Sequence, residues 1–378
     1  MNQTYTQETI NAMAMARALH YQPSLATMLY QQLGSATAVI EQGNNIDDVL
    51  PEATPRLKEL LSHIGEQREV VDKELEFCDT HSIQILTMGD ADYPQRLLEC
   101  DDAPVVLYYR GSTPLNAMHV VSVVGTRRCT PYGEDFIHRL VADLSMACPG
   151  LLVVSGLAYG VDVCAHRSAL ESKLPTVAVL AHGLDDLYPS RHRSVANAMV
   201  NAGGLLTEYM THTNADKLNF VRRNRIVAGM ADACVLIESA AHGGGLITAE
   251  IARDYGRDVF ALPGRVGDTY SAGCNQLIRD NGAALLTSAD DLIQAMGWQS
   301  DAQRQQAKER GIERELFPNL SEEERKIVEV LKGNNDIQVN ILSVQAGIPI
   351  HRLSSLLFEM EMKGMVRPLA GGTYHLIG

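Results

Sequence analysis

Short apolar runs alternate with longer amphipathic stretches through the middle of the chain. The runs are HVVSVVG, LLVVSG, TVAVLAHG, GLLTE, ACVLIE and DVFALPG, and a weaker one follows at Ala284 to Leu286. Most of them end in glycine, serine or glutamate where the next amphipathic stretch begins. Continuous apolar runs of this kind are typical of a parallel sheet that helices cover on both faces. The pattern therefore predicts an α/β fold whose ligands bind at the carboxyl edge of the strands.

The N-terminal part of the chain has a helical pattern instead. Apolar residues recur there at three- and four-residue spacing, with breaks at Pro23 and Pro51. This pattern predicts a small helical domain over residues 1–65. A charged helix and two short strands then lead into the sheet, so we expect the central domain to span residues 66–298.

The C-terminal part predicts a linker and a further small domain. Residues 299–317 are rich in glutamine, lysine, arginine and glutamate, which is typical of a linker. Beyond them, Ser321 and Glu324 have the spacing of a helix capping box. Two more helical stretches follow, and the tail predicts two strands around the glycine pair at 371–372. Three helices and a hairpin are typical of a winged helix, which we expect over residues 318–378.

Composition narrows the class of protein. The chain of 378 residues is 46% hydrophobic and 21% charged, as in ordinary globular proteins. It contains no apolar run near the roughly 18 residues that cross a bilayer, and its start does not have the pattern of a secretion signal. We therefore expect a cytoplasmic protein that does not bind membranes. Its seven cysteines form no CxxC pair, which argues against a disulfide framework and against a metal site.

The distribution of charge limits where an anion could bind. A net charge of −14 argues against a protein that coats nucleic acid through bulk electrostatics. Between Val121 and Trp298, 15 lysines and arginines face 18 aspartates and glutamates, a net of −3, so an anion site must be a local patch. The winged-helix region has six basic against seven acidic residues, and its last helix carries Glu359 and Glu361. That balance favours a protein-interaction or regulatory role over duplex DNA binding.

Three glycine-containing loops follow apolar runs and precede helical stretches. Backbone N–H groups and helix N-termini at such loops bind phosphate, and an arginine adds a bidentate partner. The GxGxxG fingerprint of dinucleotide-binding folds does not occur in the sequence, and we expect no cofactor. The candidate phosphate-binding residues in these loops are Gly125, Thr126, Arg127, Arg128, Ser155, Gly156, Gly244 and Thr248.

The segment from Lys217 to Arg225 is the strongest local feature. It holds four basic residues, no acidic residue follows before Asp232, and Phe220 lies among the cations. A single strand of nucleic acid needs both components, because phosphates meet the cations while an unpaired base stacks on the ring with roughly 1–3 kcal/mol. The alternative interpretation is a solvated basic helix face with Phe220 in the core. The candidate DNA-binding residues here are Lys217, Phe220, Arg222, Arg223, Asn224 and Arg225.

Taken in order, these motifs resemble the DNA processing protein A family, also called DprA or Smf. The resemblance covers about residues 93–293 and rests on YPQRL, VVGTRR, TPYG, SGLAYGVD, GLDDLYP, LLTEY, FVRRNRIVAG, GGGLITA, VFALPG and GCNQLIRDNGA. It implies an extended Rossmann-type core, preceded by a helical domain similar to a sterile-alpha-motif module and followed by the winged helix. Thr126, Thr207 and Gly243 stand where serine is more common in the family.

The resemblance also implies a function without catalysis. Members of the family bind incoming single-stranded DNA during natural transformation, form homodimers and help to load the recombinase RecA. Single-stranded DNA, RecA and a second copy of the chain are therefore the expected partners, and no catalytic residue is expected. By motif, the phosphate-contacting arginine falls on Arg127, and the lysine and aromatic residue three positions apart fall on Lys217 and Phe220. The remaining arginines of the segment then lie at or beside the same site.

Two other functions fit part of the sequence. The loop from Gly243 to Glu250 looks like the phosphate loop of Rossmann-type nucleotide phosphoribohydrolases. In such an enzyme, Glu250 beside an arginine would assist glycosidic cleavage. That interpretation leaves the basic segment with Phe220 unexplained. The second alternative is a recombinase-interaction scaffold whose DNA binding is incidental, because partner surfaces leave no readable motif.

Overall fold

The computed structural model describes residues 5–51, 53–298, 320–333, 337–363, 365–369 and 372–376. The chain divides into two compact units, residues 1–301 and 302–378, each of which is described by itself. The predicted linker at 299–317 lies outside the described residues.

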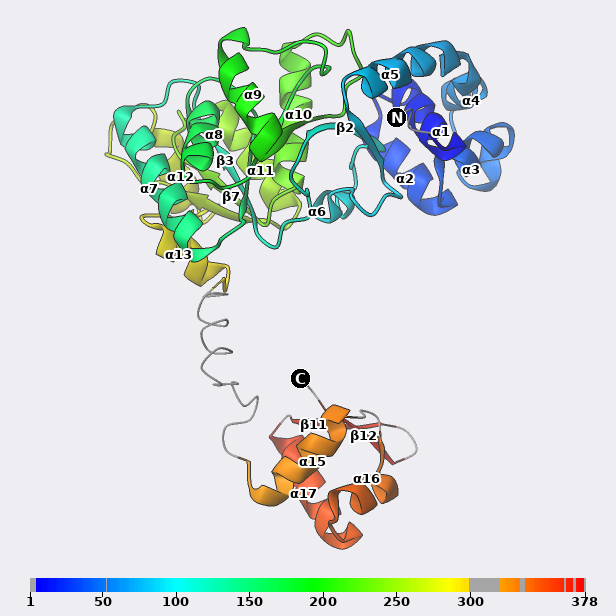
Figure 1. Ribbon diagram of the computed structural model, residues 1–378, viewed down its shortest axis with the longest axis vertical. Helices are drawn as coiled ribbons and strands as arrows, with labels where there is room; N and C mark the ends of the chain where they lie inside the picture. The colour runs from blue at the N-terminus through cyan, green and yellow to red at the C-terminus, as the bar shows by residue number, and fades with distance from the viewer. Residues whose placement is uncertain are drawn as a thin grey trace. The chain divides into compact units, whose positions relative to one another are not determined.

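A nine-stranded sheet forms the centre of the first unit (Figure 1). Its strands are β1 Gln84–Thr87, β2 Val106–Gly111, β3 Val120–Val124, β4 Leu152–Ser155, β5 Thr176–Val179, β6 Gly203–Thr207, β7 Ala233–Leu236, β8 Asp258–Ala261 and β9 Ala284–Leu285. Their order is β1-β2-β6-β5-β4-β3-β7-β8-β9. The pairs from β6 to β9 are parallel, whereas β2 pairs antiparallel with both β6 and β1. The predicted α/β fold with a parallel core is thus confirmed.

Helices cover both faces of this sheet because its strands are apolar on both sides. Val121 and Val123 belong to the hydrophobic cluster under one face, and Val120 and Val124 belong to the cluster under the other. The first face is covered by α7 Pro131–Ala147, α8 Val161–Glu171, α9 Arg193–Ala202 and α13 Ala289–Ala295. The second is covered by α10 Lys217–Gly229, α11 Gly244–Asp254 and α12 Ala272–Arg279. Short turns of helix, α6 Gln95–Leu98 and η3 Ser190–His192, lie in the connections.

The N-terminal helices share a core with the sheet. They are α1 Gln7–Ala18, α2 Pro23–Leu33, α3 Ala36–Glu41, η1 Gly43–Asp48, α4 Pro55–Ser62, η2 Ile64–Gln67 and α5 Arg68–Thr80. Figure 1 shows them together beside β2. Met13, Leu29 and Leu107 belong to one continuous hydrophobic cluster. Glu74 of α5 also accepts a hydrogen bond of 3.0 Å from the backbone of Thr211. The regions predicted as separate domains at 1–65 and 66–298 therefore form one compact unit in their described residues.

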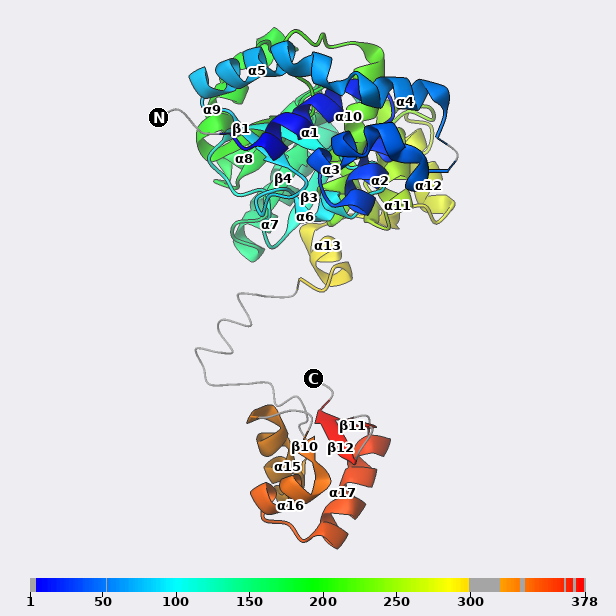
Figure 2. The same ribbon diagram turned by 90° about the vertical axis from the view of Figure 1, so that its right-hand side faces the viewer.

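The second unit is the predicted winged helix. It consists of α15 Glu322–Gly333, β10 Ile337–Gln338, α16 Val339–Ala346, α17 Ile350–Met362, β11 Val366–Leu369 and β12 Thr373–Leu376 (Figure 2). The capping box forms as predicted, since Ser321 N donates to Glu324 Oε2 at 2.7 Å and Glu324 N donates to Ser321 Oγ at 3.2 Å. Within the described parts of the chain no single helix is long and apolar enough to cross a membrane, although α16 and α17, bent by 105°, reach both criteria together.

Candidate nucleic-acid interface

The loops predicted to bind phosphate meet at the point where the strand order reverses. The chain winds from β3 toward β6 on one side and from β7 toward β9 on the other, and in open α/β sheets ligands bind at such a point. Val161 N donates to Thr126 O at 3.1 Å, which joins the first two loops. Gly160, with φ of +73°, permits this approach, because a Cβ there would collide with the same carbonyl oxygen. The two loops therefore form one continuous surface.

A buried carboxylate orders the first loop. Glu238, at the end of β7, accepts hydrogen bonds from Thr130 N at 2.8 Å and Thr130 Oγ1 at 2.5 Å. Its backbone oxygen accepts from Thr126 N at 2.7 Å. Both carboxylate oxygens are thus bound to the protein, so Glu238 positions the loop that carries Arg127. The sequence signal for this role is weak: Glu238 is the last residue of the apolar run ACVLIE.

Arg127 and Phe220 lie face to face although they are distant in sequence. The Arg127 guanidinium carbon lies 5.1 Å from the centre of the Phe220 ring, within cation–π range. Tyr188, which is 45% exposed, approaches the same ring with centroids 5.7 Å apart. Lys217, three residues before Phe220 on α10, is exposed, as is Arg128. We call these five residues the basic–aromatic surface.

Tyr188 was not among the predicted site residues. It stands in the GLDDLYP motif, but nothing in the spacing of that motif showed that its ring would reach Phe220. Asn224, which was predicted, lies one residue beyond the buried Arg223 on α10 and is half-buried. The third predicted loop does reach the site, because a Cβ at Gly245 would lie 3.0 Å from the Cα of Gly125. Gly244 beside it is exposed and begins α11.

Arg223 lies beneath the basic–aromatic surface rather than on it. Its side chain is buried, donates to Val179 O and lies 5.9 Å from the centre of the Phe220 ring. Burial lowers the pKa of Arg223, and the neighbouring Asp162 opposes that effect. A Cβ at Gly156 would collide with the guanidinium, so Gly156 makes room for it. Arg223 therefore adds positive charge below the surface and cannot reach a strand by its side chain.

Three other predicted ligands need correction because their side chains face the interior. Arg225 is 6% exposed and pairs with Glu208, and its Nε lies 3.9 Å from Asp102 Oδ2. Ser155 is fully buried and donates to Val123 O at 2.6 Å. Thr248 is 3% exposed. These side chains stabilise the fold under the loops, whereas the prediction placed them at the phosphate.

Arg222 leaves α10 on a different side from Phe220. Its guanidinium carbon lies 4.7 Å from the centre of the Tyr21 ring, which belongs to the turn between α1 and α2. The predicted site residues of α10 are thus divided between a surface facing the sheet loops and a surface facing the N-terminal helices. No sequence signal connected Tyr21 with α10, because the contact depends on how the helical region packs.

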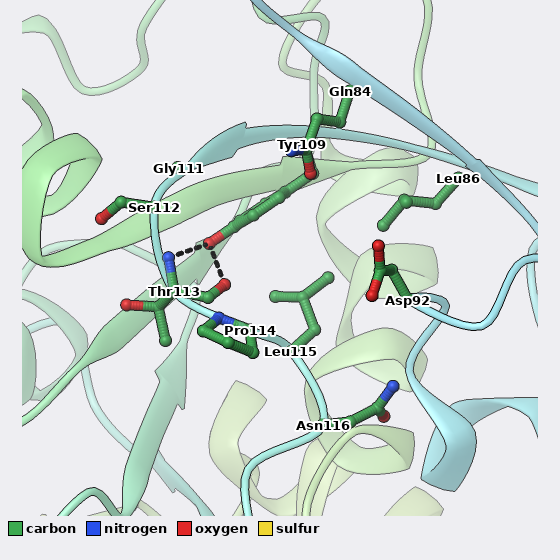
Figure 3. A pocket seen from close by; sticks show the side chains of 10 residues that line it. All are labelled: Gln84, Leu86, Asp92, Tyr109, Gly111, Ser112, Thr113, Pro114, Leu115 and Asn116. Atoms are coloured by element: carbon green, nitrogen blue, oxygen red, sulfur yellow. Dashed lines mark hydrogen bonds between the residues drawn. The ribbon is translucent and has the colours of Figure 1, made fainter.

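A pocket at the antiparallel edge of the sheet has the wrong chemistry for phosphate (Figure 3). It encloses about 200 Å³ between β1, β2 and the segment from Ser112 to Asn116. Its lining includes the carboxylate of Asp92 and neither lysine nor arginine. The Tyr109 hydroxyl inside it donates to Thr113 O at 2.7 Å and accepts from Thr113 N at 3.2 Å. In the described part of the chain no cluster of side chains could hold a metal ion.

The matching family models and curated relatives agree on one family. A family model described as DNA recombination-mediator protein A matches residues 84–297, and one described as the DprA winged helix domain matches residues 315–372. A putative DNA processing protein DprA of Mycobacterium tuberculosis is 34% identical over 322 residues, which is 81% of each chain. Protein Smf of Escherichia coli is 29% identical over 347 residues, which is 89% of each chain.

Solved structures of the same family superpose on much of this chain. DNA processing protein A of Streptococcus pneumoniae superposes with a TM-score of 0.58 and 30% identity, covering 73% of this chain and 96% of that one. A structure of DNA processing protein A of Helicobacter pylori, which addresses its single-stranded DNA binding mode, superposes with a TM-score of 0.51 and 29% identity. That match covers 56% of this chain and 95% of the other.

Proposed function

Because this chain belongs to the DprA/Smf family of DNA processing proteins, we propose that it binds single-stranded DNA on the basic–aromatic surface during natural transformation. The observation that carries the proposal is the contact between Arg127 and Phe220, in which the guanidinium carbon lies 5.1 Å from the ring centre. A cation from one loop and an aromatic ring from another element meet there beside exposed Lys217. An unpaired base can stack on the ring while its phosphates contact the cations.

The phosphate backbone is expected to run over the exposed loop residues. Arg127, Arg128 and Lys217 supply positive charge at the surface, and buried Arg223 supplies positive charge below it. The first-turn N–H groups of α11 at Gly244 add donors near the same loops. Asp216 caps α10, since its Oδ1 accepts from Asn219 N at 2.8 Å, so this nearby carboxylate is engaged with the helix.

We further propose that binding proceeds without bond cleavage. Glu250, the carboxylate that a nucleotide hydrolase would need, is exposed on α11. Asp162 is buried, which raises its pKa, and its Oδ2 accepts a hydrogen bond from Ala158 N at 3.3 Å. This interaction fits a role in holding the second loop. The binding role also explains Lys217 and Phe220, which the hydrolase leaves without a function.

The partners proposed for the chain are RecA, which it would help to load on the bound strand, and a second copy of itself. Both follow from the family resemblance, and they place its action in the cytoplasm. A pull-down of RecA by a variant that no longer binds DNA separates the two roles. Retained capture supports a RecA contact of the protein itself, whereas loss of capture together with DNA would mean that the strand alone connects them.

The test of DNA binding is the salt dependence of affinity. Lys217→Ala should weaken the binding of oligothymidylate and of other single-stranded sequences to a similar extent. It should also reduce the slope of log affinity against log salt concentration by about 0.7, the value for one single-strand phosphate contact. Arg127→Ala should act in the same direction. Fluorescence anisotropy of a labelled oligonucleotide across a salt series measures both quantities.

A matched control is Lys73→Ala on α5. Lys73 is 72% exposed and forms an ion pair with Glu69 at 2.7 Å, so its removal changes the net charge equally. The control should leave both the affinity and the slope close to those of the wild type. Wild-type values for Lys217→Ala and Arg127→Ala together would overturn the proposed site.

A further inference from the structure

Helix α10 exposes two chemically similar sides. Phe220 and Arg222 are two residues apart, which separates them by about 200° around the helix axis. Phe220 faces Arg127 and Tyr188, whereas Arg222 faces Tyr21. Each side therefore pairs an arginine with an aromatic ring, although only the first side belongs to the basic–aromatic surface.

Tyr21, which Arg222 contacts on this second side, lines a cleft of about 410 Å³ between the N-terminal helices and the segment after β6. Aromatic rings form its wall. His20 and Tyr21 are 4.9 Å apart and His20 and Tyr209 are 5.5 Å apart between ring centroids, both edge to face. Tyr21 is 73% exposed, so one of these rings is open to a ligand. The volume lies within the range of small-ligand sites, about 300–1,000 Å³.

Two arginines bring positive charge to the cleft. Arg17 lines it and Arg222 lies against Tyr21 at its edge. Among the described residues of the lining, Glu208 is the one carboxylate, and Arg225 pairs with it. Burial lowers the pKa of His20, so this ring adds no charge to that of the two arginines at neutral pH. Arg222 Nη1 is buried and, within the part of the chain that the structure describes, has no hydrogen-bond partner.

We propose that this cleft binds an unpaired nucleobase together with its phosphate, as a second subsite for the strand that occupies the basic–aromatic surface. Tyr21 supplies the ring on which the base stacks, and Arg222 and Arg17 supply the contacts to phosphate. The inference rests on the proposed function, because the same strand supplies both nucleotides.

The surface of α10 between the two sides favours one continuous strand over a separate small ligand. It exposes Lys217 together with Leu218 and Val221, which are 53% and 45% exposed. A cation and two apolar side chains suit a strand that crosses the helix, and no acidic residue lies on α10 to repel it. A helix with its side chains is about 10–12 Å across, so a few nucleotides span it.

The experiment compares two lengths of oligothymidylate: about 2 nucleotides, too short to span α10, and about 20 nucleotides, longer than the roughly 4–16 nucleotides of single-strand binding folds. The full-length protein is used. Tyr21→Ala should weaken binding of the long oligonucleotide on the order of tenfold, the loss of one stacked base, and leave the short one unchanged. Tyr21→Phe, which keeps the ring, should bind both like the wild type. Because Tyr21 is mostly exposed, neither change disturbs folding.

The other variants separate this inference from the proposed function. Phe220→Ala should weaken both lengths, and Lys73→Ala should weaken neither. If Tyr21→Ala binds the long oligonucleotide like the wild type while Phe220→Ala does not, the second subsite is wrong and the proposed function stands. If the wild type binds neither length, the proposed function itself fails.

Thymidine monophosphate tests the source of the nucleotide. Competition by the free mononucleotide against the long oligonucleotide should require far higher concentrations than competition by the short one. If Tyr21→Ala abolishes mononucleotide binding but leaves the long oligonucleotide unaffected, the cleft binds free nucleotides and the strand assignment is overturned.

Discussion

The Phe220 ring has one neighbour that attracts phosphate and one that can contact a base. Arg127 covers it with a cation, and Tyr188 approaches it with a second ring. A base that stacks on Phe220 releases few counterions, because stacking involves no phosphate. The contributions of the ring and of the cations to affinity should therefore be distinguishable by their dependence on salt concentration.

Phe220→Ala is expected to weaken single-strand binding by about 1–3 kcal/mol with little change in the salt slope. Phe220→Trp, which keeps an aromatic face, should retain most of the affinity. Anisotropy titrations at several salt concentrations give both quantities. A change in slope as large as that of Lys217→Ala would mean that Phe220 acts through the cations instead of through a base.

Two glycines of the loops differ in what an added methyl group would meet. Gly156→Ala pushes a Cβ into the Arg223 guanidinium, so we expect it to lower the free energy of unfolding by about 1–3 kcal/mol, the usual cost of overpacking. Gly244→Ala meets no atom within 4 Å and begins a helix, so it should be neutral or stabilising by about 0.5–1 kcal/mol. Urea denaturation of the two variants beside the wild type measures the difference. Equal stabilities would show that Arg223 moves freely.

At the residue scale the sequence located the site better than it assigned the contacts. Arg127, Lys217 and Phe220 were predicted as a group, and the structure brings Arg127 onto the ring. Arg225 could not be separated from them by sequence, because its burial depends on Glu208 in another element. A run of arginines in the sequence indicates positive charge, but it does not show which side chains of the helix are buried and which are exposed.

Helix α8 and strand β5 bury a histidine between them. His166 accepts or donates a hydrogen bond of 2.7 Å with Thr176 Oγ1 and is fully buried. Burial, with help from the charge of Arg223, lowers the pKa of His166 to about 3. An unfolded histidine titrates near pH 6.5. Below that pH the unfolded chain binds a proton that the folded chain does not, so stability is complete above about pH 6.5 and falls as the pH drops toward 3.

We therefore expect the wild type to lose up to about 1.4 kcal/mol of stability per pH unit through this group on acidification from about pH 6.5. His166→Gln keeps a polar partner for Thr176 but does not titrate. Urea unfolding between about pH 7 and pH 5 should show a steeper decline for the wild type than for the variant. Parallel curves would mean that the pKa of His166 is the same in the folded and the unfolded chain.

At the element scale the strands were the most predictable part. Runs without polar alternation predicted β3 to β8 and their parallel pairing, since both faces are covered. The antiparallel pairing of β2 with β6 was not predicted, because a short apolar run indicates neither the neighbouring strand nor the relative direction of the two strands. The glycines of β6 explain the pairing afterwards, since a Cβ at Gly204 would collide with the Tyr109 ring.

At the scale of the whole molecule, the N-terminal helices belong to the same compact unit as the sheet. Their apolar side chains complete the cluster under β1 and β2, so the boundary predicted at residue 65 does not separate two cores. The helical spacing gave the helices but could not show which of their apolar residues pack against the sheet. The winged helix, in contrast, has a cluster of its own around Leu342, Leu353 and Leu357.

Truncation tests this division. A fragment of residues 1–298 should bind single-stranded DNA with the affinity and salt slope of the full chain. A fragment of residues 80–298 exposes several apolar side chains of the shared cluster at about 1.5–3 kcal/mol each, so its melting temperature should fall by at least about 10 °C. Calorimetry and anisotropy on both fragments measure these effects. Equal melting temperatures would show that the shared cluster adds no stability.

If one strand occupies both sides of α10 as proposed, their arrangement also predicts a preference for single-stranded over duplex DNA. A nucleic acid that touches both Phe220 and Tyr21 must turn by about 200° around a rod about 10–12 Å thick. Duplex DNA stays nearly straight over about 50 nm, so it cannot follow so tight a curve. A single strand bends there without difficulty. Selection would then depend on the stiffness of the nucleic acid, and duplex DNA would be excluded by its shape, whatever its base sequence.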